Sequence, residues 1–293
     1  MDGNGLGQII RLFAKACRGE DFSVAEIQNG NLPRANAVPP LAPNQTPILH
    51  SELRRCTSNA ATAAYEGHCA EPNGLYWTYF RFFAASLVKL KEKASDRYQR
   101  GCEGISTNIA VSTLLWRALS IALASHEPLT LLRAVNGRQF LSPPVADSYV
   151  GNMVAGVFAS MSRQDLTRDL SLRAIALHVR KATLSQDDHY IRSLAHLIRS
   201  EPDKSTIAFE VDRADRDLII SLWAHLPMFE SFGDLLRTPD FLRRPTLTPS
   251  GGYAYLMPMD LDGNIDVTLS LREIDLARMK GDRIWMSYAE WLG

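Results

Sequence analysis

Hydrophobic residues recur at helical spacing within the first twenty residues. One face of the predicted helix carries Leu6, Ile9, Ile10, Phe13 and Cys17. Basic side chains fall on the opposite face, which is typical of an amphipathic helix. Gly19 stands where the helix is expected to end. No strand precedes this helix, and a glycine-punctuated turn leads directly into it, so the pattern is typical of the inside of a domain.

The pattern breaks down in residues 28–50, which hold five prolines together with four Asn residues and one Gly. Proline and glycine in this density disfavour regular structure. We therefore predict a long connection here, without a helix or a strand.

Regular patterns resume at residue 75. The aromatic run LYWTYFRFF (75–83) predicts a strand. Residues 84–98 predict a helix with Leu87 and Leu90 facing inward and the lysines facing outward. Residues 105–124 predict a strongly apolar helix, which the hydroxyl of Ser106 or Thr107 is able to cap.

A strand and a further helix are predicted in the middle of the chain. Residues 129–141 read as a strand that ends in a turn at Asn136-Gly137. Residues 162–182 predict a helix that starts with a capping box from Ser162 to Asp165. We expect its buried face to consist of Leu166, Leu170, Ala174 and Leu177.

The last sixty residues contain a hairpin pattern. YAYLMPM and IDVTLSL flank the turn DLDGN at residues 260–264. The second of these segments is predicted to be a half-buried strand because Ile265, Val267, Leu269 and Leu271 alternate with polar residues. A final helix is expected to begin near Leu271. Strands and helices mix without strict alternation, so we predict a mixed α/β fold with helices packed on a sheet.

Composition excludes several classes of protein. The 293 residues predict one large or two ordinary domains. Lys plus Arg equals Asp plus Glu at 32 each, so there is no basic footprint for nucleic acid. No apolar run is long enough for a membrane span, and no secretory signal is evident. The four cysteines (Cys17, Cys56, Cys69, Cys102) show no CxxC spacing and read as reduced thiols of a cytoplasmic protein.

The short motifs with possible chemistry are incomplete. Gly3, Gly5 and Gly7 do not match GxGxxG. The turn at 260–264 resembles a calcium loop, but Leu271 stands where the ligand Glu is required. His68 and Cys69 are adjacent without further ligands at metal-binding spacing, so no metal site is predicted.

The order of five segments is more informative. FRFFAASLVKLKEKA, ISTNIAVSTLLWRAL, NGRQFLSPPV, YVGNMV and LWAHLPMFESFG follow one another. This order resembles the BAHD family of plant and fungal acyltransferases, and especially its fungal branch with the trichothecene 3-O-acetyltransferases. The resemblance covers essentially the whole chain. It implies a fold of two similar α/β domains, like chloramphenicol acetyltransferase, joined by a long crossover loop around a channel. It also implies acyl-CoA as co-substrate and no bound cofactor.

The opening residues match part of the family's first motif, His-x-x-x-Asp-Gly. Asp2 and Gly3 match its Asp-Gly, and the His would lie three positions before Met1. By resemblance that His is the general base, so we expect the chain to be the C-terminal part of a longer enzyme. The expected divisions are residues 1–27 as the remainder of the first domain, 28–74 as the crossover loop and 75–293 as the second domain.

The resemblance also assigns roles to Asp2 and Arg138. In the family the Asp is structural and pairs with an arginine in the segment that reads NGRQFLSPP here, which makes Arg138 the partner. We expect a contact of about 2.7–2.9 Å between the two side chains. Because the pair lies at the start of the chain, we expect it to be exposed and worth about 0–1 kcal/mol. The alternative is a frayed Asp2 and a solvated Arg138.

Weaker matches point to the substrates. The family's Asp-Phe-Gly-Trp-Gly element survives as Phe232 and Gly233, and by resemblance it shapes the CoA channel. Asn152, in YVGN, would lie near the acceptor end. Ser106 and Thr107 fall in the segment that approaches CoA in related enzymes, or they simply cap a helix.

These features together predict an O-acyltransferase. It would move an acyl group, expected to be acetyl, from acyl-CoA to a hydroxyl of a fungal secondary metabolite such as a mycotoxin. Without the motif His, the chain alone is expected to be inactive. The alternative is a non-catalytic remnant or binding domain. Partners would be acyl-CoA and a small alcohol, with no nucleic acid and no membrane, and full-length relatives are usually monomeric.

Overall fold

The computed structural model describes residues 1–55, 74–95, 104–123, 129–209, 217–244, 249 and 251–293. Its main sheet, within these residues, has the strand order β4-β3-β6-β7-β8-β2-β9. The strands are β2 (Leu75–Phe82), β3 (Leu129–Asn136), β4 (Val154–Met161), β6 (Leu218–Leu222), β7 (Tyr253–Leu256), β8 (Ile265–Arg272) and β9 (Glu290–Trp291). β3, β6 and β7 run parallel and the other pairs are antiparallel, so the sheet is mixed and the predicted fold class is confirmed.

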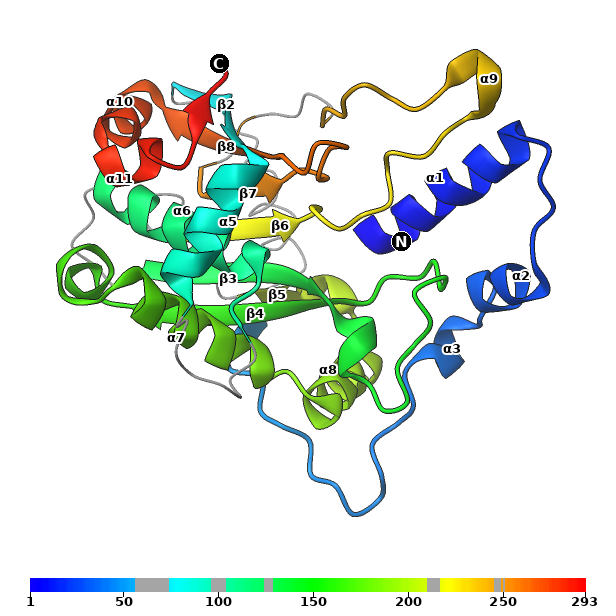
Figure 1. The fold of residues 1–293 in the computed structure, drawn as a ribbon. Coiled ribbons are helices and arrows are strands. Elements are labelled where there is room, and N and C mark those ends of the chain that lie inside the picture. The colour runs from blue at the N-terminus through cyan, green and yellow to red at the C-terminus, as the bar shows by residue number, and fades with distance from the viewer. Residues whose placement is uncertain (56–73, 96–103, 124–128, 210–216, 245–248, 250) are drawn as a thin grey trace.

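Helices pack against this sheet around one central helix, α6 (Thr107–Leu123) (Figure 1). Its neighbours are α5 (Ala84–Ala94), α7 (Leu172–Leu184), α10 (Glu273–Gly281) and α11 (Arg283–Met286). α6 is buried along most of its length because its sequence is apolar on nearly every side, as expected for a helix enclosed by others. Ser106 Oγ accepts a hydrogen bond from Ile109 N at 3.2 Å, so the predicted cap is present.

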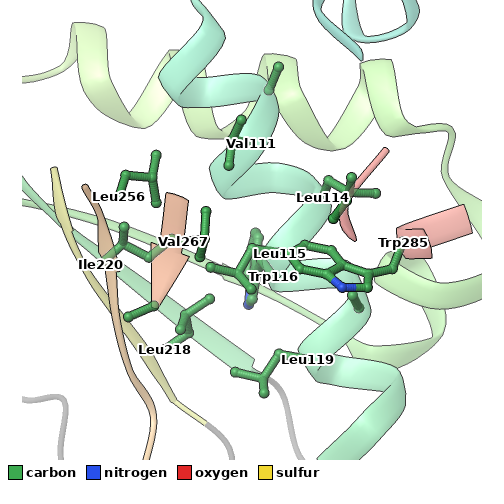
Figure 2. Close-up of a cluster of buried hydrophobic side chains, with 14 of the residues drawn as sticks. Val111, Leu114, Leu115, Trp116, Leu119, Leu218, Ile220, Leu256, Val267 and Trp285 are labelled. Atoms are coloured by element: carbon green, nitrogen blue, oxygen red, sulfur yellow. The ribbon is translucent and has the colours of Figure 1, made fainter. Parts of the chain in front are cut away.

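The core lies between α6 and the sheet (Figure 2). Figure 2 shows side chains of α6 facing residues of β6, β7 and β8, among them Leu115, Ile220 and Val267. Phe80 and Phe82, on the inner face of β2, each contact the Trp285 ring edge-on at 5.2 Å between centroids. The strand predicted at 75–83 is confirmed as β2, and the helix predicted after it is confirmed as α5, with Leu87 and Leu90 buried as expected.

Smaller elements lie at one end of the sheet. They are α1 (Gly3–Cys17), α2 (Val24–Gly30), α3 (Arg34–Ala37) and α9 (Gly233–Leu236), which Figure 1 shows on the same side of the molecule. α8 (Asp188–Ser200) follows α7, and the turns η1 (Gly137–Phe140), η2 (Asp165–Asp169) and η3 (Lys204–Thr206) connect larger elements. Strands β1 (Leu53–Arg55) and β5 (Ile207–Phe209) form a separate antiparallel pair.

The buried face of α1 differs from the prediction. Gly5, Gly7 and Ala14 are its buried residues, whereas Ile9 and Phe13 are exposed. The reason is close packing: a Cβ on Gly5 would lie 2.5 Å from the Val150 carbonyl oxygen. The smallest side chains therefore face the rest of the protein.

Three further expectations are wrong in detail. Residues 28–50 were predicted to lack regular structure, but α2 ends at Gly30 and α3 follows. The helix predicted at 162–182 is interrupted at Leu170, whose extended backbone separates η2 from α7. Leu170 and Leu177 are exposed, and the buried face of α7 consists of Ile175, Ala176 and Val179.

The C-terminal hairpin is confirmed, since β7 and β8 pair around the turn that begins at Asp260. However, β8 is buried on both faces instead of one, and its second face carries small polar residues such as Ser270. In the part of the chain that is described, no helix combines the length and apolarity that a bilayer crossing requires.

The long connection after α3 is attached to α8 by polar contacts. Ile48 N donates to Ser193 Oγ at 3.1 Å. Glu52 Oε1 contacts His50 Nδ1 at 2.8 Å and accepts a short hydrogen bond from the Tyr190 hydroxyl. Burial opposes ionisation of Glu52, but the hydrogen bonds from Tyr190 and His50 outweigh it and lower the pKa of this carboxyl. The segment is thus fixed on α8 by a half-buried carboxylate.

Candidate active site

Asp2 and Arg138 are in direct contact, as the sequence predicts. Arg138 Nη1 donates to Asp2 Oδ2 at 2.8 Å, and Arg138 Nη2 donates to Asp2 Oδ1 at 3.2 Å. The Asp2 side chain is 3% exposed and that of Arg138 is 0% exposed. The expectation of an exposed pair is therefore wrong, because the backbone of 149–153 encloses it.

Local structure explains the position of Asp2. Its side chain caps α1 by accepting from Gly5 N at 2.7 Å, and it also accepts from Met153 N at 2.8 Å. Burial raises the pKa of Asp2, but the hydrogen bonds from Arg138, Gly5 and Met153 outweigh it and lower the pKa below its ordinary value. The carboxylate is thus held ionised and fixed in direction.

Arg138 organises the chain that follows. It lies on η1, directly after β3, where Asn136 Oδ1 accepts from its Nη1 at 3.0 Å. Its Nη2 also donates to the carbonyls of Tyr149 and Gly151 at 2.8 and 2.7 Å. One guanidinium thereby joins the start of α1, the end of β3 and the YVGN segment.

A cavity of about 400 Å³ adjoins this pair. Its wall is built from the start of α1, the start of α6, the ends of β3 and β6 and the end of α7. The residues lining it are Asp2, Gly3, Asn4, Ser106, Asn108, Ile109, Arg133, Ala134, Val135, Asn136, Val154, Thr183, Ser221, Leu222, Trp223, His225 and Leu226. Nine of these seventeen residues carry polar or charged side chains and the others are apolar or glycine, so the cavity offers both hydrogen-bonding groups and apolar surface to a small molecule.

The other predicted site residues are divided between the cavity and other places. Ser106 lines the cavity, but Thr107 and Asn152 do not. Asn152 is exposed, and its Oδ1 accepts from Val154 N at 3.1 Å, which makes it a local backbone cap.

Phe232 and Gly233 also lie away from the cavity. They stand at the far end of α1, where the Phe232 ring contacts Phe13 at 5.9 Å between centroids. The fifteen residues of α1 span about 22 Å from Asp2 to that end. This element therefore supports α1 and does not line the cavity, and its role in shaping the CoA channel stays a prediction.

The sequence interpretation missed Arg133, Trp223 and His225. Arg133 was detectable, since it continues the alternation of Leu129 and Leu131 and so falls on the inner face of β3. Burial lowers its pKa to about 10, so the guanidinium stays charged at neutral pH.

Within the described ranges, no three His, Cys, Asp or Glu side chains come together in a way that could hold a metal ion. Cys17 is a free, exposed thiol. His68 and the other three cysteines lie outside the described residues.

Comparison with known proteins gives consistent results. A family model described as the Transferase family matches residues 1–284. The O-acyltransferase pigD of Monascus ruber is 32% identical over 300 residues, covering 100% of this chain and 65% of that protein. The trichothecene 3-O-acetyltransferase TRI101 of Fusarium sporotrichioides is 30% identical over 301 residues, covering 100% of this chain and 64% of its own length.

Solved structures agree with the sequence matches. The crystal structure of F. sporotrichioides TRI101 complexed with coenzyme A and T-2 superposes with a TM-score of 0.86 at 28% identity, over 100% of this chain and 65% of that chain. Vinorine synthase, at 18% identity and a TM-score of 0.65, shares the fold. The chain thus spans about 65% of the length of the relatives it matches.

Proposed function

The chain belongs to the transferase family of BAHD-type acyltransferases, and on that premise we propose that it forms part of a CoA-dependent O-acyltransferase. The acyl group, proposed to be acetyl, would pass from acyl-CoA to a hydroxyl of a fungal secondary metabolite. Support comes from the names of its relatives, an O-acyltransferase and a trichothecene 3-O-acetyltransferase. Further support is the TRI101 structure with coenzyme A and T-2.

The observation that carries the proposal is the buried Asp2–Arg138 pair at the wall of the cavity. In the motif His-x-x-x-Asp-Gly, a carboxylate fixed on both oxygens would hold the turn that presents the His. The His position of this motif would fall three residues before Met1, outside the 293 residues. The chain is proposed to supply the Asp-Gly half of the motif and one wall of the site.

The reaction would be a direct transfer. The base takes the proton of the acceptor hydroxyl, and the hydroxyl oxygen attacks the thioester carbonyl carbon. A tetrahedral oxyanion forms and collapses with cleavage of the C–S bond. The proton then passes to the CoA sulfur, which leaves as the free thiol. Asp2 touches neither reactant in this scheme and acts only by positioning.

The proposed division follows the crossover architecture of the family. Residues 1–27 would belong to the first domain, 28–74 to the crossover loop and 75–293 to the second domain. Two contacts support this division. The glycines of α1 pack against Val150 and Pro227, and the segment before β1 is attached to α8 by polar contacts.

Binding of acetyl-CoA tests the proposal without requiring turnover. Isothermal titration of the chain with acetyl-CoA should give saturable binding. Trp223→Ala should weaken it because this side chain lines the cavity, whereas Trp291→Ala, at the opposite edge of the sheet, should not. Absence of binding, or equal binding by both variants, would contradict the proposed site.

A further inference from the structure

A buried guanidinium without an acidic partner faces the cavity. Arg133 is 3% exposed and lies on the inner face of β3. Its Nε donates to Ser112 Oγ at 3.2 Å and its Nη1 to Thr183 Oγ1 at 3.1 Å. Within the described residues no carboxylate pairs with it. Arginine has five N–H donors, so three of them have no hydrogen-bond partner in the part of the chain that the structure describes.

The two hydroxyls fix the direction of Arg133 but do not neutralise it. Thr183 lies in the last turn of α7, where the helix end carries partial negative charge. This interaction makes a buried cation tolerable. If position 133 had only a structural role, an apolar side chain there would stabilise the folded protein more than arginine does, because burying a charge costs far more free energy than burying a hydrocarbon.

The rest of the cavity adds positive potential. The 17-residue helix α6 begins at its wall, with Ser106 and Asn108 among the lining residues. Asp2 is the one acid in the described lining, and each of its oxygens already accepts two hydrogen bonds. Arg138 neutralises the charge of Asp2. The charge of Arg133 is therefore not compensated by an acid among the described residues that line the cavity.

We propose that Arg133 recognises a carboxylate on a substrate that occupies this cavity. This inference rests on the proposed function and names a property of its substrates: either the acyl group or the acceptor is an organic acid. A small inorganic anion would leave most of the roughly 400 Å³ unfilled. The apolar walls from Ile109, Leu222 and Trp223 suit the carbon skeleton of such a substrate.

A thermal-unfolding titration of the wild-type chain tests the anion site directly. Malonate should raise the midpoint with saturation, whereas neutral malonamide at matched ionic strength should not. Arg133→Met should weaken malonate binding about 10- to 100-fold, as expected for loss of hydrogen bonds to a charged group. Arg133→Lys should retain part of it. Arg163→Met is the matched control, because Arg163 also bonds to α6, through Ser120 O, but does not line the cavity.

Equal effects of malonate and malonamide on the wild-type protein would overturn the inference, and this comparison holds even if Arg133→Met fails to fold. Unchanged malonate binding in a folded Arg133→Met protein would overturn it as well.

Calorimetry with CoA esters distinguishes the source of the carboxylate. Tighter binding of malonyl-CoA than of acetyl-CoA, lost in Arg133→Met, would place it on the acyl group. Equal binding of both esters, with Arg133-dependent binding of malate beside acetyl-CoA, would place it on the acceptor. Binding of malonate without binding of either ester would contradict the proposed function but support the anion site. Binding of both esters without any Arg133-dependent anion binding would contradict only the inference.

Discussion

The carboxylate of Asp2 and the guanidinium of Arg138, 136 residues apart, form hydrogen bonds of 2.8 and 3.2 Å in the interior of the protein. The pair joins the first turn of α1 to η1 at the end of β3. Because the same guanidinium also binds the carbonyls of Tyr149 and Gly151, it fixes three segments beside the cavity. The contact therefore holds the segments around the site in place and also stabilises the folded protein.

Asp2→Asn should strongly destabilise the protein. It leaves the buried charge of Arg138 uncompensated, and removal of one partner of a buried pair costs about 3–5 kcal/mol. Urea unfolding of both proteins measures the loss. Glu20→Gln, which removes the acid of the exposed Arg18–Glu20 pair, is the control and should leave the midpoint unchanged. Equal effects of the two substitutions would show that the Asp2 pair behaves as a surface pair.

The contribution of Asp2 should depend on pH. Its pKa is lowered from 3.8 in the folded protein, since hydrogen bonding outweighs the opposing effect of burial. A folded pKa below the unfolded one stabilises the protein above about pH 4, and this stability is lost as the pH falls through the folded value. The difference in unfolding free energy between wild type and Asp2→Asn should therefore shrink from pH 7 to pH 3. A constant difference would mean that this carboxyl does not titrate as described.

Gly5→Ala should destabilise the protein although alanine is the better helix former. The new Cβ would lie 2.5 Å from the backbone oxygen of Val150, so the backbone has to move, at a cost of about 1–3 kcal/mol. Gly281→Ala, at the end of α10, meets no atom within 4 Å and should stabilise by about 0.4–1 kcal/mol. Chemical denaturation of both variants measures the change in unfolding free energy, which should be of opposite sign in the two. Stabilisation by Gly5→Ala would contradict the close approach of α1 to the backbone at Val150.

Tyr190→Phe should loosen the connection before β1. The hydroxyl donates to Glu52, and a hydrogen bond to a charged group contributes about 1.5–3 kcal/mol. We expect faster cleavage in residues 38–52 under limited proteolysis, together with a lower unfolding midpoint. Tyr288→Phe is the control, since its hydroxyl makes no hydrogen bond to a described residue. Similar cleavage of both variants would argue against this attachment.

Local periodicity predicted several elements correctly, although it did not predict that β8 is buried on both faces. β2, α5 and the β7–β8 hairpin follow from alternation and turn chemistry in a few residues. The face of α1 did not follow, because helical spacing identifies an apolar stripe but not which side another chain segment covers. Gly5 and Gly7 carry no side chain and so contribute nothing to an apolar pattern, yet they are buried against the rest of the protein.

The site was predicted in part, through motif resemblance instead of periodicity. Asp2 and Arg138 were paired from the family pattern, but their burial depends on residues 149–153, which no local pattern places there. Phe232 matched a motif and still lies at the far end of α1. Arg133 was visible as a charge on an apolar strand face, and its importance emerges only when the cavity is known.

Exposed apolar residues on α1, on α2 and on the segment between them should drive self-association. Ile9, Phe22 and Ile27 are 44%, 45% and 51% exposed and line a hollow of about 260 Å³ between the two helices. Contiguous apolar patches of several hundred Å² are typical of interaction surfaces. Sedimentation velocity should show concentration-dependent association that Phe22→Ser reduces. Leu184→Ser, an equally drastic change at a 62% exposed position on α7, should not reduce it. A monodisperse monomer at high concentration would contradict this prediction.

The chain as it stands should not transfer acetyl groups to alcohols above background. General-base catalysis is worth about 10²–10⁴ in rate, and the His of the motif is not among the 293 residues. His225 is the one histidine in the described lining of the cavity, so it is the residue that could replace the missing base. Release of free CoA from acetyl-CoA, followed with a thiol reagent, checks the prediction. Turnover that disappears in His225→Ala but persists in His196→Ala, a change on α8 outside the cavity, would show that the chain carries its own base. No turnover despite binding of acetyl-CoA would instead agree with a site whose structural half lies in this chain and whose base precedes Asp2 in the motif.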